Sequence, residues 1–167
     1  MMTSSSTSLR PNLAWIYAKP WRIIAFGMGS GAIYPAPGTW GTLWAWAVWL
    51  LVLQFIPLGA MSLFLGLAFA IGVWACQLSG DELGVSDHGG MVWDEAVAFW
   101  LVLWLLPTPA WWMQGLAFGA FRLFDIIKPP PIRFFDQKVG GGFGVMLDDI
   151  LAAGYSLLFL YLVALWL

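Results

Sequence analysis

The chain has 167 residues, 61% of them hydrophobic and only 10% charged, and its mean hydropathy is +0.82. Soluble domains are near half apolar and about a quarter charged, so this composition argues against an ordinary soluble protein. The net charge of −2 is too small to indicate binding to nucleic acid, and one cysteine with one histidine excludes an internal disulfide and a zinc centre of about four N/S ligands. Thirteen tryptophans, a residue enriched at membrane–water interfaces, favour an all-α integral membrane protein.

The N-terminal segment, residues 1–22, is expected to be disordered or interfacial, and a single membrane domain follows over residues 23–167. Residues 1–8 are rich in Ser and Thr, which is typical of disorder, and no apolar stretch of a signal peptide follows them. Residues 15–23 mix aromatic with basic side chains, a composition that suits the lipid headgroup layer. A plain linker to the first membrane segment explains that stretch equally well.

Three long stretches of the chain lack charged residues: 23–80, 96–121 and 150–167. A membrane-spanning helix needs roughly 20 apolar residues, and prolines such as Pro57 and Pro107 interrupt helices. The pattern predicts a small polytopic helical bundle with about five membrane segments, at 40–56, 61–78, 91–106, 110–124 and 150–167. The third and fourth segments are short, and we expect them to form a thin, tilted or partly inserted hairpin.

Five segments place nearly all charges on one side of the bilayer, in residues 1–39, 79–94 and 125–149. Treating 96–121 as a single span would instead divide the basic residues between both faces. Lys and Arg favour cytoplasmic loops. We therefore expect the charged loops, and any active site that they form, on the cytoplasmic side.

The first polar stretch contains two glycine-rich segments, Gly27–Gly31 and Pro35–Thr42, directly before the first membrane segment. Glycines let backbone N–H groups approach an anion, and a helix N-terminus has unpaired N–H groups and a positive dipole end. Ser30, Thr39 and Thr42 add hydroxyl donors, so the stretch is a candidate phosphate-binding loop. The alternative is an ordinary turn that starts a helix, with Thr39 or Thr42 as its N-cap.

The second polar stretch contains Asp87, His88, Asp94 and Glu95 at the head of the third segment. Carboxylates in the first turn stabilise a helix through its dipole, which is the simplest explanation for the acidic pair. Glu95, however, lies at the apolar boundary, where ionisable groups are costly and indicate function. His88 could be a base or a phosphate contact, although a loop histidine is more often merely solvated.

The third polar stretch begins with cations and ends with acids. Its candidate residues are Arg122, Asp125, Lys128, Arg133, Asp136, Asp148 and Asp149. The acidic pair is expected at the start of the last helix and precedes the small residues 152–154, which permit close helix packing. The last helix can then approach the third segment and gather Asp94, Glu95, Asp148 and Asp149 at one membrane face.

Four clustered carboxylates would repel one another unless a cation intervened. Oxygen-only ligands suit a hard ion, so we expect Mg²⁺ bound by Asp94, Glu95, Asp148 and Asp149. The alternative is four separate helix caps with salt bridges to Arg122, Lys128 and Arg133. A Mg²⁺ site of this kind favours phosphate substrates.

Several classes of phosphatase are excluded by what the sequence lacks. Cys76 has no arginine close behind it, no Asp-x-Asp nucleophile motif occurs, and one histidine cannot be both nucleophile and acid. The chemistry left is attack by a metal-activated water, with Lys and Arg stabilising the phosphoryl oxygens. The candidate catalytic residues are Asp94, Glu95, Asp149 and Lys128. The candidate phosphate ligands are Ser30, Thr39, Thr42, Arg122, Lys128 and Arg133.

Three ordered motifs resemble the phosphatidylglycerophosphatase A family: Gly-x-Gly-Ser-Gly…Pro-Gly-Thr-x-Gly over 27–41, Asp-His-Gly…Val-Trp-Asp-Glu over 87–95, and Phe-Arg…Asp-Asp over 121–149. The resemblance covers residues 23–156. Gly140 stands where relatives often have His, which argues against a catalytic histidine in that loop, and Ala98 where they often have Gly. The resemblance implies Mg²⁺-dependent removal of the terminal phosphate of phosphatidylglycerophosphate, giving phosphatidylglycerol at the bacterial inner membrane.

A non-enzymatic membrane protein is the competing hypothesis: a cation channel, a transporter or an assembly subunit whose carboxylates bind a passing ion. Transport favours charges near the middle of a membrane segment. The centres of the predicted segments carry none. The distribution of charge therefore favours the lipid phosphatase.

Overall fold

The computed structural model describes residues 10–167, and this part of the chain contains helices and no strand. The expected all-α fold is confirmed. The expected disorder of residues 1–8 lies outside the described residues. The elements are α1 (Leu13–Tyr17), α2 (Pro20–Ala25), the 3₁₀ helix η1 (Gly27–Ala32), α3 (Pro37–Leu51), the 3₁₀ helix η2 (Leu53–Phe55), α4 (Leu58–Leu83), α5 (Trp93–Trp104), α6 (Trp111–Ile127), α7 (Ile132–Lys138) and α8 (Gly141–Ala164).

The helices are interrupted at Pro57 and near Pro107, as the sequence predicted. Pro57 caps the start of α4, and the segment around Pro107 separates α5 from α6. A proline ring cannot continue the preceding helix without a clash and a lost hydrogen bond, so each apolar run is divided into a helical pair. The expected third and fourth segments are therefore two separate helices, α5 and α6.

The last helix begins nine residues earlier than the expected start at Ile150, because the glycine-rich run at its head is itself helical. The backbone of Gly142 lies directly against α4, where a Cβ atom would approach the Val73 carbonyl oxygen to 2.1 Å. The Gln77 side-chain oxygen accepts a hydrogen bond from the Gly142 amide at 2.9 Å. The prediction that Asp148 and Asp149 start this helix is wrong, since they lie about two turns inside it.

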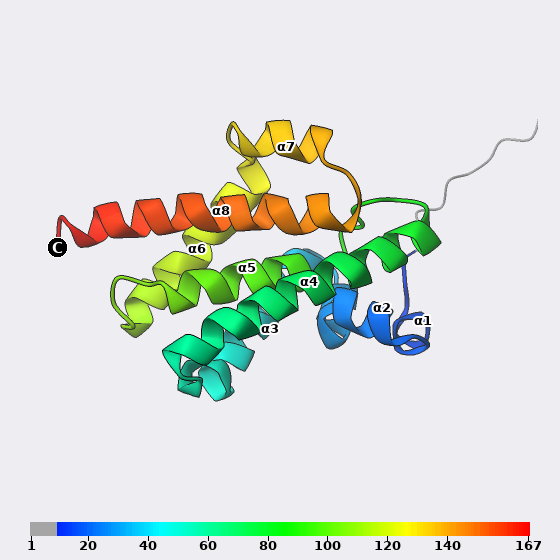
Figure 1. The fold of residues 1–167 in the computed structure, drawn as a ribbon, viewed down its shortest axis with the longest axis horizontal. Helices are drawn as coiled ribbons and strands as arrows, with labels where there is room; N and C mark the ends of the chain where they lie inside the picture. Colours follow the sequence, from blue (N-terminus) through cyan, green and yellow to red (C-terminus); the bar gives the residue numbers. More distant parts are fainter. Residues whose placement is uncertain (1–9) are drawn as a thin grey trace, which may run out of the picture.

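Five longer helices, α3, α4, α5, α6 and α8, alternate in direction along the long axis of the molecule (Figure 1). At one end, Gly38 at the start of α3 meets Glu95 at the start of α5 and Arg122 near the end of α6. Near the opposite end, the Tyr161 hydroxyl of α8 donates to the Leu105 carbonyl oxygen, 3.0 Å away, just after α5. This alternation gathers the charged segments of the sequence at one end.

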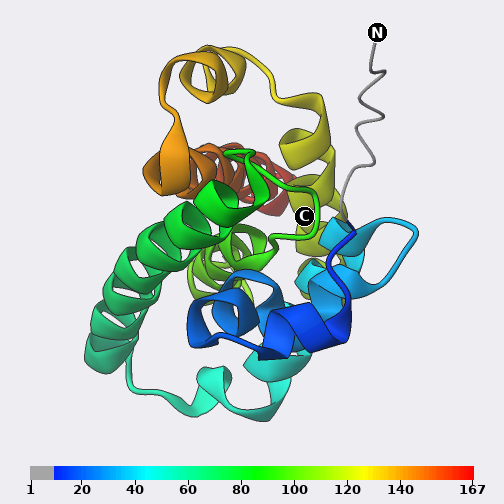
Figure 2. The ribbon, with the colours of Figure 1, turned by 90° about the vertical axis from the view of Figure 1, so that its right-hand side faces the viewer.

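The N-terminal elements α1, α2 and η1 pack together at this charged end (Figure 2). Arg22 is buried, stacks 3.8 Å from the ring centroid of Trp15, and donates from Nε to Glu82 Oε2 at 2.6 Å. Lys19 reaches the other oxygen of Glu82 at 2.7 Å. These contacts attach the region predicted to be interfacial to the end of α4.

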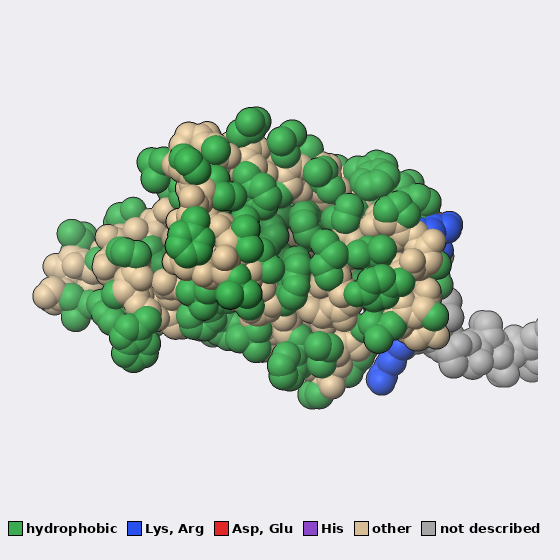
Figure 3. Space-filling model, turned by 90° about the horizontal axis from the view of Figure 1, so that it is seen from below, with side chains coloured by type: hydrophobic (Ala, Val, Ile, Leu, Met, Phe, Trp, Pro, Cys, Tyr) green, Lys and Arg blue, Asp and Glu red, His purple; other side chains and the backbone are tan. Residues whose placement is uncertain are grey.

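Two helices of the described chain, α4 and α8, are long and apolar enough to cross a membrane, judged by length and composition alone. Only 28% of the most apolar part of α4 is buried within the protein, and large apolar side chains cover the surface seen in Figure 3. The other three longer helices have 15, 12 and 17 residues, fewer than the roughly 20 of a typical membrane span.

Some tryptophans are buried between helices, and others are exposed on the surface. Trp100 is 2% exposed, and its ring nitrogen donates to the Ala45 carbonyl oxygen at 2.8 Å, which ties α5 to α3. Trp93 packs edge-on against Trp100 with ring centroids 5.6 Å apart. Trp111 and Trp166, by contrast, are among the most exposed side chains. Part of the tryptophan excess therefore builds the helix interfaces beneath the charged end.

Candidate active site

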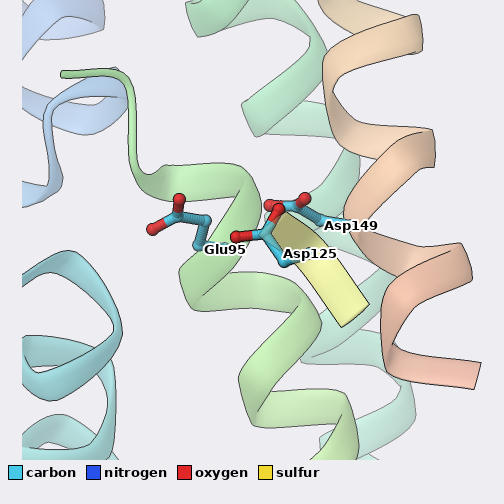
Figure 4. A group of neighbouring side chains, drawn as sticks. All are labelled: Glu95, Asp125 and Asp149. Atoms are coloured by element: carbon cyan, nitrogen blue, oxygen red, sulfur yellow. The ribbon is translucent and has the colours of Figure 1, made fainter. Parts of the chain in front are cut away.

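A group of three carboxylates lies where α5, α6 and α8 converge (Figure 4). Glu95 comes from the first turn of α5, Asp125 from the last turn of α6 and Asp149 from the interior of α8. One oxygen from each lies within 4.8 Å of the others. Helices far apart in the sequence thus bring three acids within the span of a single bound cation.

Arg122 is the cation nearest to this group. Its Nη1 lies 2.9 Å from Glu95 Oε1 and 2.5 Å from Asp125 Oδ2. Residues three apart on a helix share a face, which places Arg122 and Asp125 on the same side of α6. One guanidinium carries a single positive charge, so it cannot neutralise three ionised carboxylates.

Several buried carboxylate oxygens at this end have no hydrogen-bond partner among the described residues. They are Asp94 Oδ1, Glu95 Oε2, Asp148 Oδ1 and Asp149 Oδ2. Buried polar atoms are nearly always hydrogen-bonded, and a buried charge without a partner is costly. Unsatisfied carboxylate oxygens on two neighbouring helices, α5 and α8, fit a hard divalent cation, because Mg²⁺ prefers oxygen ligands.

The N-terminus of α3 forms one wall of the site. A Cβ atom on Gly38 would lie 2.3 Å from Glu95 Oε1 and 2.7 Å from Arg122 Nη2, so only glycine fits there. The positive end of the α3 dipole therefore faces the acidic group directly. Thr39, a predicted phosphate ligand, follows in this first turn and is half-buried.

The other glycines of the predicted phosphate-binding stretch serve close packing. A Cβ atom on Gly31 would approach the Gly90 carbonyl oxygen to 1.9 Å, and one on Gly41 would approach the Val92 Cβ to 2.4 Å. The amides of Gly29 and Gly31 both donate to the Phe26 carbonyl.

The Ser30 hydroxyl donates to the Gly27 carbonyl and the Thr42 hydroxyl to the Gly38 carbonyl, each at 2.8 Å. Thr39 directly follows Gly38, the residue of this stretch that lies against Glu95 and Arg122.

Lys128 forms a second charged contact beside the carboxylate group. Its Nζ lies 2.9 Å from Asp136 Oδ1 and 3.2 Å from Asp148 Oδ2. Burial disfavours the ammonium, but the hydrogen bond to Asp136 and the charges of Asp148 and Asp136 outweigh it and raise the pKa of Lys128. The lysine is therefore charged at neutral pH.

The backbone of Lys128 adopts a left-handed conformation with φ of 49° and ends α6, and Pro129 follows it. A non-glycine residue rarely adopts this conformation, so the surrounding contacts must hold it there. The direction of the lysine side chain is thus determined by the end of the helix.

The four predicted metal ligands do not all lie together in the structure. Glu95 and Asp149 belong to the carboxylate group, whereas Asp148 faces Lys128. Asp94 is buried in the first turn of α5 but does not belong to the group of three. Asp125, which was not among the metal ligands predicted from the sequence, is the third member of the group instead of Asp94. Its spacing of three residues from Arg122 could have indicated that the two side chains lie on the same face of a helix.

The remaining candidates lie around this centre. Arg133 is exposed on α7 and forms no ion pair among residues 10–167. Asp87 lines a small cavity together with Asp136 and Asp148. His88 accepts a hydrogen bond at Nδ1 from the Gly90 amide at 3.0 Å, and its ring lies 5.9 Å from that of Phe26.

Comparison with known proteins shows which family the chain resembles. The sequence profile of the phosphatidylglycerophosphatase A family matches residues 23–164. Phosphatidylglycerophosphatase A of Haemophilus influenzae is 42% identical over 148 residues, which cover 89% of this chain and 91% of that protein. Phosphatidylglycerophosphatase A of Escherichia coli is also 42% identical, over 87% of this chain and 84% of that protein.

A third relative is named a putative phosphatidylinositol-3-phosphatase, from Bacteroides thetaiotaomicron. It is 38% identical over 86% of this chain and 92% of its own length. No solved structure matches the chain. The family profile and the two relatives at 42% identity, each covering most of both sequences, show that the chain belongs to the phosphatidylglycerophosphatase A family.

Proposed function

We propose that this protein is a Mg²⁺-dependent lipid phosphatase that removes the terminal phosphate of phosphatidylglycerophosphate and forms phosphatidylglycerol. The substrate follows from the names of the two relatives at 42% identity. The chemistry is supported by one observation above all: Glu95, Asp125 and Asp149 converge beside Arg122, with buried oxygens that lack a partner.

The proposed Mg²⁺ would be held by Glu95, Asp125 and Asp149, with Asp94 and Asp148 close enough in sequence to contribute. When bound, the ion supplies a Lewis acid that neutralises negative charge on the phosphoryl group and activates water. The described donor set consists only of carboxylate oxygens, which suits this ion.

The chain's own residues bind the phosphate and move a proton. Arg122, which pairs with Glu95, and Lys128, which pairs with Asp148, would hold the phosphoryl oxygens. The Thr39 hydroxyl and the Gly38 amide would add neutral donors. The amides of Thr39 and Trp40 already donate to the Ala36 carbonyl. Glu95 or Asp149 would accept the proton from the attacking water, because each has an oxygen without a hydrogen-bond partner.

The proposed topology has five membrane segments, α3, α4, α5, α6 and α8, in the inner membrane, with the active site on the cytoplasmic side. The alternating directions of these helices and the placement of the charged side chains at one end support it. The 12 residues of α5 cover about 18 Å at 1.5 Å per residue, so this helix would penetrate only part of a core about 30 Å thick.

A channel or transporter gains no support from the described structure. The middle of α4 carries no charged side chain. Glu95 and Asp125 lie at the ends of α5 and α6 that meet at the charged end of the molecule, and Asp148 and Asp149 lie in the half of α8 that begins at this end. A transport site would be expected close to the membrane midplane. An enzyme that works at the membrane surface accounts better for this placement.

The test is phosphate release from phosphatidylglycerophosphate by purified protein in detergent. We expect turnover with Mg²⁺, reversible loss on EDTA treatment, and loss in Asp149→Asn. Glu82→Gln removes a carboxylate that pairs with Lys19 and Arg22 outside the site, and it should keep most of the activity. Absence of phosphate release from the folded wild-type protein with Mg²⁺ would contradict the proposed function.

A further inference from the structure

A cavity of about 390 Å³ lies where the end of α4 meets the start of α8. Its polar side chains are Gln77 and Asp81 from α4 and Ser86 from the loop that follows. The backbone of Gly141 and Gly142 forms the opposite wall. The mechanism proposed above assigns no role to this space.

This cavity leads toward the active site. A smaller cavity of about 30 Å³ shares Ser86 and Gly141 with it and is lined beyond them by Asp87, Asp136 and Asp148. Asp148 and Asp136 are the two partners of Lys128. A ligand in the larger cavity could therefore extend to the cation that is proposed to bind the phosphate.

The lining offers hydrogen-bond partners for the hydroxyl groups of a ligand, and a phosphate attached to such a ligand would have to lie outside the cavity. No Lys or Arg lines the larger cavity, and the Asp81 carboxylate would repel a phosphate. The Gln77 side chain already forms two hydrogen bonds within the protein. Its oxygen accepts one from the Gly142 amide and its nitrogen donates one to Asp81 Oδ1, each at 2.9 Å. Asp81 and Ser86 are exposed on the cavity wall and can accept and donate hydrogen bonds to alcohol groups.

We propose that this cavity binds the glycerol part of the lipid headgroup, the alcohol from which the terminal phosphate is removed. The inference rests on the proposed function and adds a specificity site to it. The cavity lies at the charged end of α4 and α8, where a headgroup would be located if these helices cross the membrane. An enzyme that hydrogen-bonds a substrate hydroxyl discriminates strongly against analogues that lack it.

The first test compares two lipid phosphomonoesters. Phosphatidylglycerophosphate has a glycerol between its two phosphates, whereas phosphatidic acid has its phosphate directly on the diacylglycerol. We expect Ser86→Ala and Asp81→Asn each to lower kcat/KM for phosphatidylglycerophosphate by about tenfold, the usual effect of losing one hydrogen bond. The residual rate with phosphatidic acid should not change.

Ser62→Ala is the matched control, because Ser62 lies at the other end of α4 and its hydroxyl donates to the Gly59 carbonyl. It should leave both rates at the wild-type level. Equal losses with both lipids in Ser86→Ala and Asp81→Asn would overturn the inference, since they would indicate a general defect. Unchanged rates with both lipids would overturn it too.

The second test measures binding without catalysis. Cys76 is the chain's single cysteine, so Cys76→Ala combined with Ser86→Cys leaves one thiol on the cavity wall. Phosphatidylglycerol in mixed micelles should slow its reaction with a small methanethiosulfonate at least severalfold, and phosphatidic acid should not. Equal protection by both lipids, or by neither, would overturn the headgroup site. A wild-type protein that releases no phosphate from either lipid would instead contradict the proposed function itself.

Discussion

The α-carbon of Gly38 lies so close to the Glu95 carboxylate that a Cβ atom on it would be 2.3 Å from Oε1. The start of α3 and the start of α5 can approach each other in this way only without a side chain at residue 38. The same Cβ would be 2.7 Å from Arg122 Nη2. One glycine thus determines how the first turn of α3 meets the acidic group.

Gly38→Ala should lower activity roughly 100-fold, because displacement of catalytic groups by about 1 Å has an effect of that size. Ala is a better helix former than Gly by about 1 kcal/mol, so helix propensity alone would favour the variant. Gly66→Ala in α4 is the control, since a Cβ there meets nothing within 4 Å. Phosphate release measures both, and equal rates for Gly38→Ala and wild type would contradict the proposed contact.

Asp125→Asn should weaken divalent-cation binding as strongly as Asp149→Asn, because both belong to the same group of three oxygens. Losing an outer partner of a metal ligand already costs about 10–100-fold in affinity, and loss of a ligand should cost at least as much. Mn²⁺ titration followed by electron paramagnetic resonance measures this directly. Full Mn²⁺ affinity in Asp125→Asn would remove it from the site, and full activity in the double variant Asp94→Asn, Glu95→Gln would contradict the proposed ligands altogether.

Arg122→Gln should destabilise the protein by an amount on the order of 3 kcal/mol in the absence of metal, because it leaves mostly buried carboxylates without their cation. Thermal unfolding in detergent measures this, and added Mg²⁺ should restore part of the loss by supplying positive charge. Arg133→Gln is the control: the exposed Arg133 forms no ion pair in the described chain, so the change should stay within about 0.5 kcal/mol. An Arg122→Gln variant as stable as the control would contradict the structural role of the pair.

Lys128→Ala should lower kcat by roughly 100-fold, because the charge proposed to stabilise the phosphoryl oxygens is lost. Lys138→Ala is the control, because it makes the same substitution at a lysine that is not proposed to bind the phosphate. Lys138 lies on α7 with its Nζ 4.9 Å from the Phe134 ring centroid. Single-turnover phosphate release should separate the two variants. A wild-type rate in Lys128→Ala would indicate that this lysine only balances Asp136 and Asp148.

Reporter fusions should show the proposed topology directly. Fusions after Leu58, Gly80, Thr108, Lys138 and Leu167 should report outside, inside, outside, inside and outside in turn. The reason is that Lys and Arg favour the cytoplasmic side. A Lys138 fusion on the outside would contradict the topology, because α7 belongs to the charged end.

Much of the fold could be predicted from the sequence by itself. Long charge-free runs broken at Pro57 and Pro107 predict helices that end there, because a helix satisfies its hydrogen bonds locally and proline interrupts them. The position of the first residue of α8 could not be predicted this way. Gly141 and Gly142 read as a loop in the sequence, and the structure makes them helical because α4 lies against them.

The composition of the site was determined in part by sequence and in part by tertiary structure. The sequence predicted Glu95 and Asp149 as metal ligands together with their neighbours Asp94 and Asp148. Sequence could not decide which member of each acidic pair faces the other helices, since neighbouring residues on a helix point about 100° apart. The packing of α5, α6 and α8 turns Glu95 and Asp149 toward Asp125 and directs Asp148 toward Lys128.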